Sequence, residues 1–259
     1  WSMKKKIIIK IGTSTLTAGT NRISFAVIES LARQIVELKK EYDVVIVSSG
    51  AIATARQFVE INGFNKNVDS KQALAAIGQT KLMELYDNIF RTFGLNIAQI
   101  LLTYRDFENE TANENTRNTI NKLWEVDYIP IVNENDTVSI EEIVLGDNDK
   151  LSALVAVITN ADLLILVSDI DGIYTCNPHL HQDAELITNV TELNSISNFI
   201  EEKESTLGTG GMSSKVHAAD ICMKHGVEMW IVNGQRANYI IKALNGRIPF
   251  TKFTTPKSP

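Results

Sequence analysis

Short apolar runs alternate with longer amphipathic segments along this chain. The first apolar run, KKIIIKIG at residues 5–12, is rich in isoleucine, a β-branched residue that packs well on a pleated sheet. The next segment, residues 24–42, places an apolar residue at every third or fourth position from Val27 to Leu38, which is helical spacing. A buried strand followed by an amphipathic helix is the repeating unit of a sheet covered by helices. The pattern therefore predicts an α/β protein.

The same alternation continues to the end of the chain. We predict further strands at residues 43–51, 95–103, 128–136, 162–174 and 227–234, and helices at 70–94, 111–126, 150–161 and 213–226. A hairpin at 138–149, a polar segment at 175–205 and a short closing helix complete the pattern. Such alternation is typical of a mostly parallel central sheet with helices on both faces, an αβα sandwich. Because no linker-like stretch or internal repeat divides the sequence, we predict one domain with two lobes.

One charged residue interrupts the first predicted strand. Lys10 stands between Ile9 and Ile11 in a run that otherwise indicates burial on both faces. A buried ammonium without a partner is strongly destabilising or loses its proton. We therefore expect this lysine to face an anion.

Polar residues also follow four of the predicted strands. These clusters lie at residues 10–14, 48–51, 133–136 and 168–172. Turn residues normally follow strands, so each cluster alone is typical of an ordinary loop. In a parallel sheet, however, ligands bind in the crevice beyond the carboxyl ends of the strands. Taken together, the four clusters predict a binding site at one edge of the sheet.

A glycine-rich segment, LGTGGMSSKV at residues 207–216, comes just before a predicted helix with Lys215 in its first turn. Glycines let the backbone approach a ligand closely, and the free N–H groups at a helix N-terminus bind anions. The segment matches neither the P-loop nor GxGxxG, so a flexible loop with a helix cap is the alternative. A lysine in a first turn opposes the helix dipole, which favours a phosphate partner.

A second polar segment, LGDNDKLSA at residues 145–153, places Asp147, Asn148 and Asp149 immediately ahead of a helix. Ordinary N-capping is the alternative interpretation, but a cap needs only one such residue. The segment CNPHLH offers Cys176, His179 and His181, whose spacing matches no common metal site. We interpret CNPHLH as a surface turn and predict no metal ligands in the protein.

Composition narrows the class of protein. The 25 basic and 31 acidic residues give a net charge of -6, which disfavours a nucleic-acid partner. Two cysteines make no disulfide framework, and neither a signal peptide nor a membrane-spanning run is evident, so we predict a cytoplasmic protein without a membrane partner. Trp1 and Ser2 precede Met3 and are interpreted as a cloning remnant.

Six segments, in order, resemble the amino acid kinase family. They are KIGTSTLT, SSGAI, IPIVNENDTV, GDNDKLSA, LVSDIDGIYT and TLGTGGMSSK, and the resemblance extends from about residue 6 to about residue 243. It is strongest to the members that phosphorylate the side-chain carboxylate of L-glutamate with ATP, the first step of proline biosynthesis. It implies a single kinase domain at residues 3–253, with an N-lobe that binds glutamate and a C-lobe that binds ATP. Many such members carry a C-terminal domain found in RNA-modifying enzymes, which we do not expect here.

The resemblance also implies residue roles. The catalytic residues would be Lys10, Asp149 and Lys215. Glutamate would be held by Ser49, Gly50, Asn133, Asp136 and Asn148. ATP would be held by Lys10, Gly12, Ser168, Asp169, Thr209, Gly210, Gly211, Met212, Ser213, Ser214 and Lys215. Ser48 and Ser168 stand where threonine is frequent in the family, a change that keeps the hydroxyl.

The chemistry of these residue types agrees with phosphoryl transfer. A carboxylate with a pKa of about 4.3 is already an ionised nucleophile at neutral pH, so no catalytic histidine is needed. Cations stabilise the transferring group, and two lysines with one Mg²⁺ would supply them. Family members acting on acetylglutamate, aspartate or UMP, and a silent nucleotide or metabolite sensor, are the alternatives. A homo-oligomer (dimer or tetramer) is expected, with proline as a possible feedback inhibitor.

Overall fold

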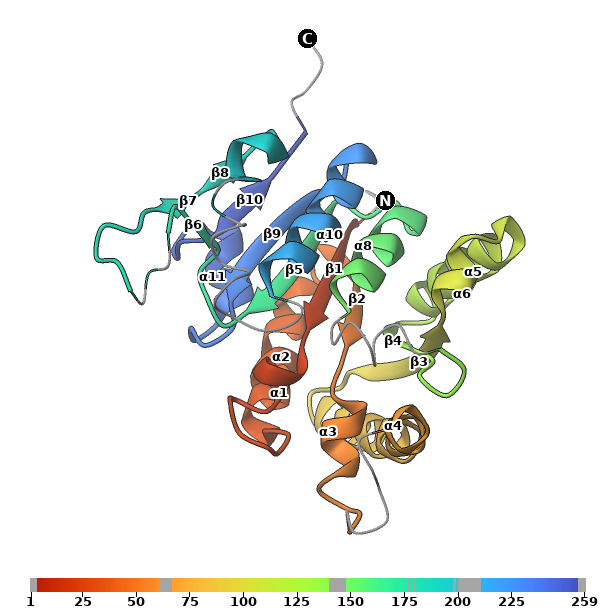
Figure 1. The fold of residues 1–259 in the computed structure, drawn as a ribbon. Coiled ribbons are helices and arrows are strands. Elements are labelled where there is room, and N and C mark those ends of the chain that lie inside the picture. The colour runs from red at the N-terminus through yellow and green to blue at the C-terminus, as the bar shows by residue number, and fades with distance from the viewer. Residues whose placement is uncertain are drawn as a thin grey trace.

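A mostly parallel sheet forms the centre of the computed structural model, which describes residues 4–60, 67–139, 148–176, 178, 180–197, 199 and 211–255. In this part of the chain the sheet has eight strands in the order β3-β4-β2-β1-β5-β9-β10-β8 (Figure 1). Its strands are β1 (Lys5–Ile11), β2 (Tyr42–Ser48), β3 (Asn96–Leu102), β4 (Tyr128–Glu134), β5 (Leu163–Ser168), β8 (Asn189–Val190), β9 (Glu228–Asn233) and β10 (Thr251–Phe253). Only the pairing of β10 with β9 is antiparallel among these strands. A separate ribbon pairs β6 (Ile173–Tyr174) with β7 (Leu186–Ile187).

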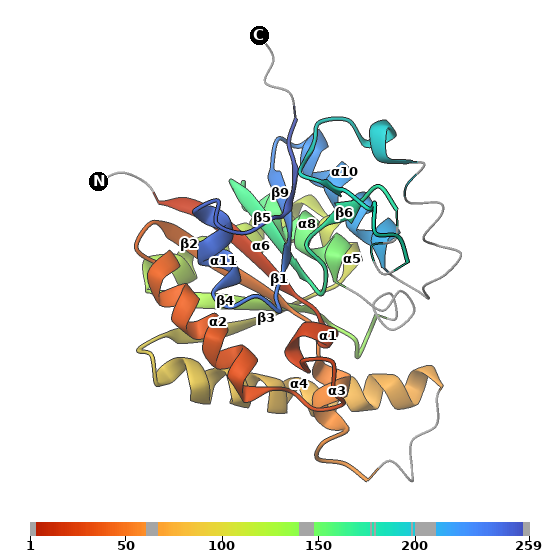
Figure 2. The same cartoon turned by 90° about the vertical axis from the view of Figure 1, so that its left-hand side faces the viewer.

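Helices cover both faces of this sheet. They are α1 (Thr13–Leu16), α2 (Phe25–Leu38), α3 (Ala51–Ala55), α4 (Val68–Arg91), α5 (Tyr104–Phe107), α6 (Glu110–Glu125), α8 (Asp149–Ile158), α10 (Met212–Lys224), α11 (Tyr239–Leu244) and the 3₁₀ turn η2 (Leu193–Ile196). Helices α2 and α11 lie on one side, and α8 and α10 lie on the other (Figure 2). Two hydrophobic cores result, one beneath α2, α4 and α11, the other beneath α6, α8 and α10. The predicted αβα sandwich is confirmed.

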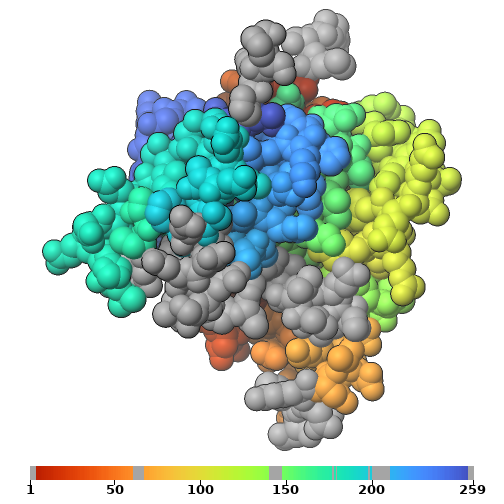
Figure 3. Space-filling view, turned by 45° about the horizontal axis from the view of Figure 1, so that its top comes forward, coloured from red at the N-terminus to blue at the C-terminus, as the bar shows by residue number. Residues whose placement is uncertain are grey.

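The first strand shows how the sequence specifies both cores. Ile7, Ile9 and Ile11 point to the core beneath α2 and α4, whereas Ile8 points to the core beneath α8 and α10. Side chains alternate between the two faces of a strand, so Lys10 continues the row that Ile8 begins. Its side chain therefore extends toward α8 and α10. In the space-filling view, α10 (blue) lies between residues around 180–197 (cyan) and the green and yellow-green helices α8 and α6 (Figure 3).

Most predicted elements occur within a few residues of their expected bounds, with several corrections. The helix predicted at 24–42 ends at Leu38, because β2 already begins at Tyr42. The strand predicted at 162–174 ends at Ser168, and β6 is a separate element. Helices α1, α3 and α5 and strand β10 were not predicted, because elements of three to five residues are too short to show the periodic spacing of apolar residues that marks a helix or a strand. Residues 140–147 of the predicted hairpin lie outside the described residues.

The turn after β2 is held against α4 by a close backbone approach. A Cβ atom on Gly78 would lie 1.7 Å from the carbonyl oxygen of Ala51, so only glycine allows α3 and α4 to pack this closely. Gly50 precedes α3 with a φ of 103°, a left-handed conformation that glycine adopts without strain. These two glycines fix the position of Ser49 and Gly50 relative to α4.

Candidate active site

The four predicted polar clusters lie at one edge of the sheet. Strands β4, β2, β1 and β5 are neighbours in that order and all run parallel. In the register of the sheet, Ile11 at the end of β1 pairs with Ser48 of β2 and with Val167 of β5. The carboxyl ends of these strands, and the polar residues that follow them, therefore meet as the sequence predicted.

The partner of Lys10 is Asp149. Nζ of Lys10 lies 2.8 Å from Oδ1 of Asp149, and Nζ of Lys215 lies 2.9 Å from Oδ2. The Asp149 side chain is 0% exposed, and the Lys10 and Lys215 side chains are 5% and 13% exposed. The hydroxyl of Ser214 also donates to Oδ2 of Asp149, at 2.8 Å. Three residues that the sequence analysis assigned to catalysis thus form one buried cluster.

The charges of this cluster fix the ionisation of the aspartate. Burial acts to raise the pKa of Asp149, but the two ammonium groups and their hydrogen bonds outweigh burial and hold that pKa well below its ordinary value. Asp149 is therefore ionised at physiological pH. Two lysines around one carboxylate leave the cluster with a net positive charge, and this arrangement can bind an additional anion.

Three elements bring the cluster together. Lys10 comes from β1, Asp149 is the first residue of α8, and Lys215 lies in the first turn of α10. Residues of α8 and α10 pack in the same core, so the N-termini of both helices lie at the end of β1. A Cβ atom on Gly12 would lie 3.2 Å from Nζ of Lys10, so the glycine keeps the space beside this ammonium open.

A second group of polar residues lies beside the ends of β2 and β4. Nδ2 of Asn148 donates to Oδ1 of Asn133 at 2.8 Å and lies 3.5 Å from the carbonyl oxygen of Ser48. Asn148 precedes α8 without capping it through its side chain, so the capping alternative is wrong for this residue. Three buried oxygens of this group have no hydrogen-bond partner in the described part of the chain: Oγ of Ser49, Oδ1 of Asp136 and Oδ1 of Asn148. Buried polar atoms are normally paired, so such atoms at a strand edge indicate a ligand with donor groups.

Asp136 is the titratable member of this group. Burial, with a smaller contribution from the charge of Glu134, raises the pKa of Asp136 to about 7. The hydroxyl of Ser139 donates to Glu134, which stabilises that neighbouring carboxylate as an anion. A cationic ligand group would lower the pKa of Asp136 again, because an opposite charge favours the ionised form.

The residues assigned to ATP are placed less completely. Ser168 is buried at the end of β5, and its hydroxyl donates to the exposed Asp169 at 3.3 Å. Gly211 precedes α10, followed by Met212, Ser213, Ser214 and Lys215 in its first turn. Thr209 and Gly210 lie outside the described residues, as does His179 of the CNPHLH segment. The described part thus has β5 and the N-terminus of α10 flanking the lysine cluster.

Sequence analysis missed two polar residues that contact this region. Gln79 donates from Nε2 to Oε1 of Gln99 at 3.0 Å, and its own Oε1 accepts from Nδ2 of Asn133 at 2.9 Å. Tyr86 makes a 2.9 Å hydrogen bond to the hydroxyl of Ser48. Both lie on the buried stripe of α4 together with Leu82 and Phe90. A glutamine within an otherwise apolar stripe is the signal that could have identified Gln79.

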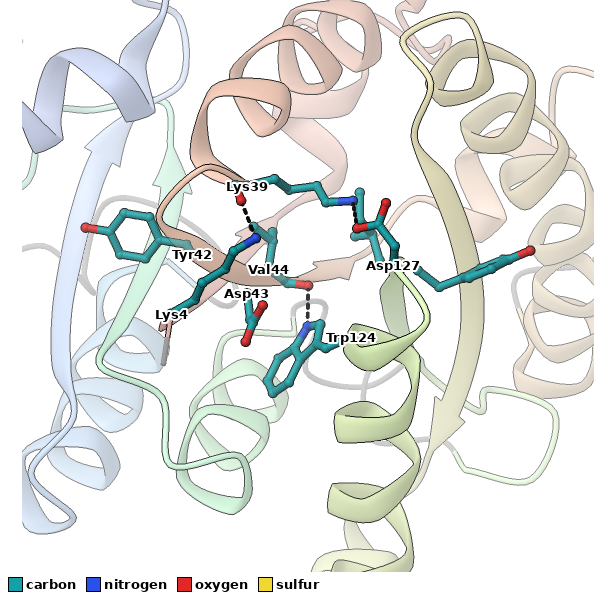
Figure 4. A pocket seen from close by; sticks show the side chains of 9 residues that line it. Lys4, Lys39, Tyr42, Asp43, Val44, Trp124 and Asp127 are labelled. Carbon is teal, nitrogen blue, oxygen red and sulfur yellow. Dashed lines mark hydrogen bonds and ion pairs between the residues drawn. The ribbon is translucent and has the colours of Figure 1, made fainter. Parts of the chain in front are cut away.

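A small pocket lies at the opposite edge of the sheet (Figure 4). It encloses about 30 Å³ beside the first residues of β2 and β4. Three of its charged groups have partners nearby: Lys39 pairs with Asp127 at 2.7 Å, and Lys4 donates to the carbonyl oxygen of Lys39. The indole N–H of Trp124 donates to the carbonyl oxygen of Val44. None of the four polar clusters contributes to this pocket, so it does not belong to the candidate site.

Within the described ranges, no three His, Cys, Asp or Glu side chains are grouped so that they could hold a metal ion. No helix in the same ranges combines the length and the apolar character that crossing a bilayer requires.

Comparisons with known proteins agree with this geometry. The model of the amino acid kinase family matches residues 5–233. Glutamate 5-kinase 2 of Pseudoalteromonas translucida is 41% identical over 97% of this chain and 70% of its own length. Glutamate 5-kinase of Vibrio vulnificus is 43% identical over 97% and 67%, and that of Clostridium tetani is 42% identical over 98% and 96%. The crystal structure of UMP kinase from Ureaplasma parvum superimposes with a TM-score of 0.67 at 18% identity, covering 98% of this chain and 100% of that one, which shows a shared fold.

Proposed function

Since the chain belongs to the amino acid kinase family, we propose that it transfers the terminal phosphoryl group of ATP to the side-chain carboxylate of L-glutamate, the first step of proline biosynthesis. The observation that carries this proposal is the pairing of Lys10 and Lys215 with one buried aspartate, next to a group of unpartnered oxygens. The product would be L-glutamyl 5-phosphate and ADP.

An ADP-release assay with four acceptors tests this function. L-Glutamate, N-acetylglutamate, aspartate and UMP are compared side by side at equal ATP. We expect turnover with glutamate alone. Aspartate has the same two groups, but its side chain is one methylene shorter. N-Acetylglutamate lacks the free ammonium, and UMP has neither the ammonium nor the carboxylate. ADP release with UMP or N-acetylglutamate instead would identify another activity of the family, and no release with any acceptor would favour the sensor alternative.

The side chains of the cluster would have different roles in phosphoryl transfer. The acceptor carboxylate is already ionised and needs no general base. The ammonium groups of Lys10 and Lys215 would contact the oxygens of the transferring group and stabilise the negative charge that spreads over them. Asp149 would not touch the phosphate; it holds both lysines in position with a net positive charge toward the substrate. Because these donors are preorganised, they need no rearrangement during the reaction.

We propose that the nucleotide binds at the carboxyl end of β5 and the N-terminus of α10. The phosphates would lie at the N-terminus of α10, where backbone N–H groups and the helix dipole favour anions. The protein groups at this end are Gly12, Ser168, Asp169 and the segment 209–215, of which Thr209 and Gly210 are included on the resemblance alone. The hydroxyl of Ser214 donates to Asp149, so the first turn of α10 lies directly beside the lysine cluster. This position supports the proposal.

The proposed Mg²⁺ would enter with the nucleotide. Both oxygens of Asp149 are occupied by lysine ammonium groups, so this carboxylate offers no direct ligand to a metal ion. Mg²⁺ is commonly held by substrate phosphates and water with few protein ligands. Phosphate oxygens would therefore be its ligands here, and the ion would supply additional positive charge at the transferring group.

The first prediction concerns the recognition of glutamate. Asp136 would pair with the α-ammonium of the substrate through a charge-assisted hydrogen bond, which is worth about 1.5–3 kcal/mol. We expect Asp136→Asn to raise the KM for glutamate by about tenfold or more and to leave the KM for ATP unchanged. Steady-state kinetics with each substrate varied in turn measures both values. Equal use of N-acetylglutamate by the parent enzyme would contradict this role, since that substrate has no ammonium.

The second prediction concerns pH. The pKa of Asp136 in the free protein is raised to about 7, so the carboxylate that pairs with the ammonium is lost as pH falls through 7. We expect kcat/KM for glutamate to fall about tenfold per pH unit below 7 and to level off above it, with a flat profile for Asp136→Asn.

Stability should show the opposite pH dependence. The pKa of Asp136 in the folded protein, about 7, lies above the ordinary aspartate pKa of 3.8, so between these values the folded state binds more protons than the unfolded state. The buried charge therefore destabilises the ligand-free protein as pH rises from about 4 to 7. Asp136→Asn should raise the melting temperature more at pH 8 than at pH 5. An equal change at both pH values would show that Asp136 does not titrate in this range.

Three further expectations extend the proposal. Assembly into a dimer or tetramer is testable by light scattering of the purified protein. Inhibition by proline is testable in the same ADP-release assay. A cytoplasmic location is proposed together with the metabolic role.

A further inference from the structure

Four side-chain amides form a continuous hydrogen-bonded chain that ends at the proposed glutamate site. The chain runs from Gln99 on β3 to Gln79 on α4, then to Asn133 on β4 and Asn148 before α8, with donor–acceptor distances of 3.0, 2.9 and 2.8 Å. Gln79, Asn133 and Asn148 are all buried. Asn133 and Asn148 already belong to the proposed substrate site. Gln79 and Gln99 lie outside that group of substrate residues.

Backbone groups fix the direction of this chain. The backbone N–H of Glu134 can only donate, and it donates to Oδ1 of Asn133 at 2.8 Å. Nδ2 of Asn133 must then face Gln79, whose Oε1 accepts from it. At the other end, Oδ1 of Asn133 and the carbonyl oxygen of Ser48 can only accept, so both require Nδ2 of Asn148. Every amide in the chain thus has one allowed orientation.

This direction determines what the site presents to a ligand. With Nδ2 of Asn148 engaged, its Oδ1 remains as a buried acceptor without a partner in the described part of the chain. A reversed amide would instead present an N–H₂ group, which a substrate ammonium cannot approach favourably. Together with Asp136, the fixed orientation makes this end of the site selective for donors.

We propose that Gln79 is a positioning residue that sets the polarity of the glutamate site, acting through Asn133 and Asn148. This inference rests on the proposed function. Gln79 occupies a position on α4 where its neighbours on the same stripe, Ala75 and Leu82, are apolar. An apolar residue would fill such a position without any need for hydrogen bonds, whereas a glutamine requires partners. Here the partner is Asn133, whose Nδ2 donates to Oε1 of Gln79 at 2.9 Å.

Two substitutions at Gln79 and one control test the proposal. Gln79→Met keeps the length and shape of the side chain but removes the acceptor for Asn133. Gln79→Glu keeps an acceptor oxygen in either protonation state. Gln72→Met makes the same change elsewhere on α4. We expect Gln79→Met to raise the KM for glutamate about tenfold, with the KM for ATP and the kcat within about twofold of the parent. Gln79→Glu should restore the KM for glutamate to within about threefold, and Gln72→Met should match the parent.

The outcomes separate positioning from packing. An unchanged KM for glutamate in Gln79→Met would overturn the proposal, as would an equal rise in the KM for ATP, which would indicate a general loss of packing. A Gln79→Glu variant as impaired as Gln79→Met would also overturn it, because the acceptor would then be irrelevant. If the parent enzyme does not phosphorylate glutamate, the proposed function fails as well; if it does and Gln79→Met is normal, only the positioning role fails.

Discussion

Lys10→Met is expected to lower kcat by about 10²–10³-fold with only modest changes in either KM. The ammonium of Lys10 is preorganised beside Gly12 and Asp149, and removal of one such donor from a transition-state site typically has an effect of this size. Because the charge on the transferring group grows in the transition state, the loss should appear in kcat more than in substrate binding. Steady-state kinetics with ATP and glutamate each at saturation measures it.

Lys6→Met is the matched control for this experiment. Lys6 lies on the same strand, but its Nζ donates to the carbonyl oxygen of Thr159 at 2.9 Å, near the other end of β1. It should keep the parent kcat. Lys10→Arg should not restore the rate, because a guanidinium fork is larger than an ammonium and directs its donors differently. A near-normal kcat in Lys10→Met would show that this lysine only supports the fold.

The large elements of the fold could be predicted because their patterns are long. Strand β1, with its run of isoleucines, has seven residues, and α2, with its apolar stripe, has 14. Short elements had no such pattern. Helix α3 depends on the left-handed turn at Gly50 and on contact with α4, and β10 joins the sheet through pairing with β9. These are tertiary contacts that no local window of sequence contains.

The candidate site likewise contains residues that the sequence could identify and contacts that it could not. Lys10 was identifiable because a charge inside an apolar strand demands an explanation, and the structure supplies Asp149 as its partner. Asp149 pairs with Lys215 at the start of α10 as well; the resemblance had implied that these two residues and Lys10 act together, but not the contacts between their atoms. Gln79 was not identified, because its partner Asn133 lies 54 positions away and the contact depends on how α4 crosses the sheet edge. Sequence thus indicated which groups are unusual, but not which groups hold them.

Asp149→Asn should impair both stability and turnover, and the two effects can be separated. The substitution keeps the shape of the side chain but leaves two largely buried ammonium groups without their shared counter-charge. Breaking a buried ion pair from one side typically lowers the free energy of unfolding by about 3–5 kcal/mol. Because Asp149 holds both lysines, we also expect kcat to fall by at least about 10²-fold, the effect of one displaced donor.

The double variant Asp149→Asn with Lys10→Met distinguishes the two roles of this cluster. Removing one of the uncompensated ammonium groups should recover part of the lost stability, so the double variant should unfold at higher denaturant concentration than Asp149→Asn alone. It should remain as inactive as the single variants, because a donor to the phosphoryl group is still missing. Because Lys10→Met alone is expected to be inactive, the role of Asp149 in turnover is decided on the single variant. A near-parent kcat of Asp149→Asn, measured at a temperature where this variant is folded, would mean that Asp149 acts only on the fold. A low kcat of the folded Asp149→Asn protein, together with stability regained in the double variant, would show that the buried aspartate holds two cations where the transferring phosphoryl group needs them.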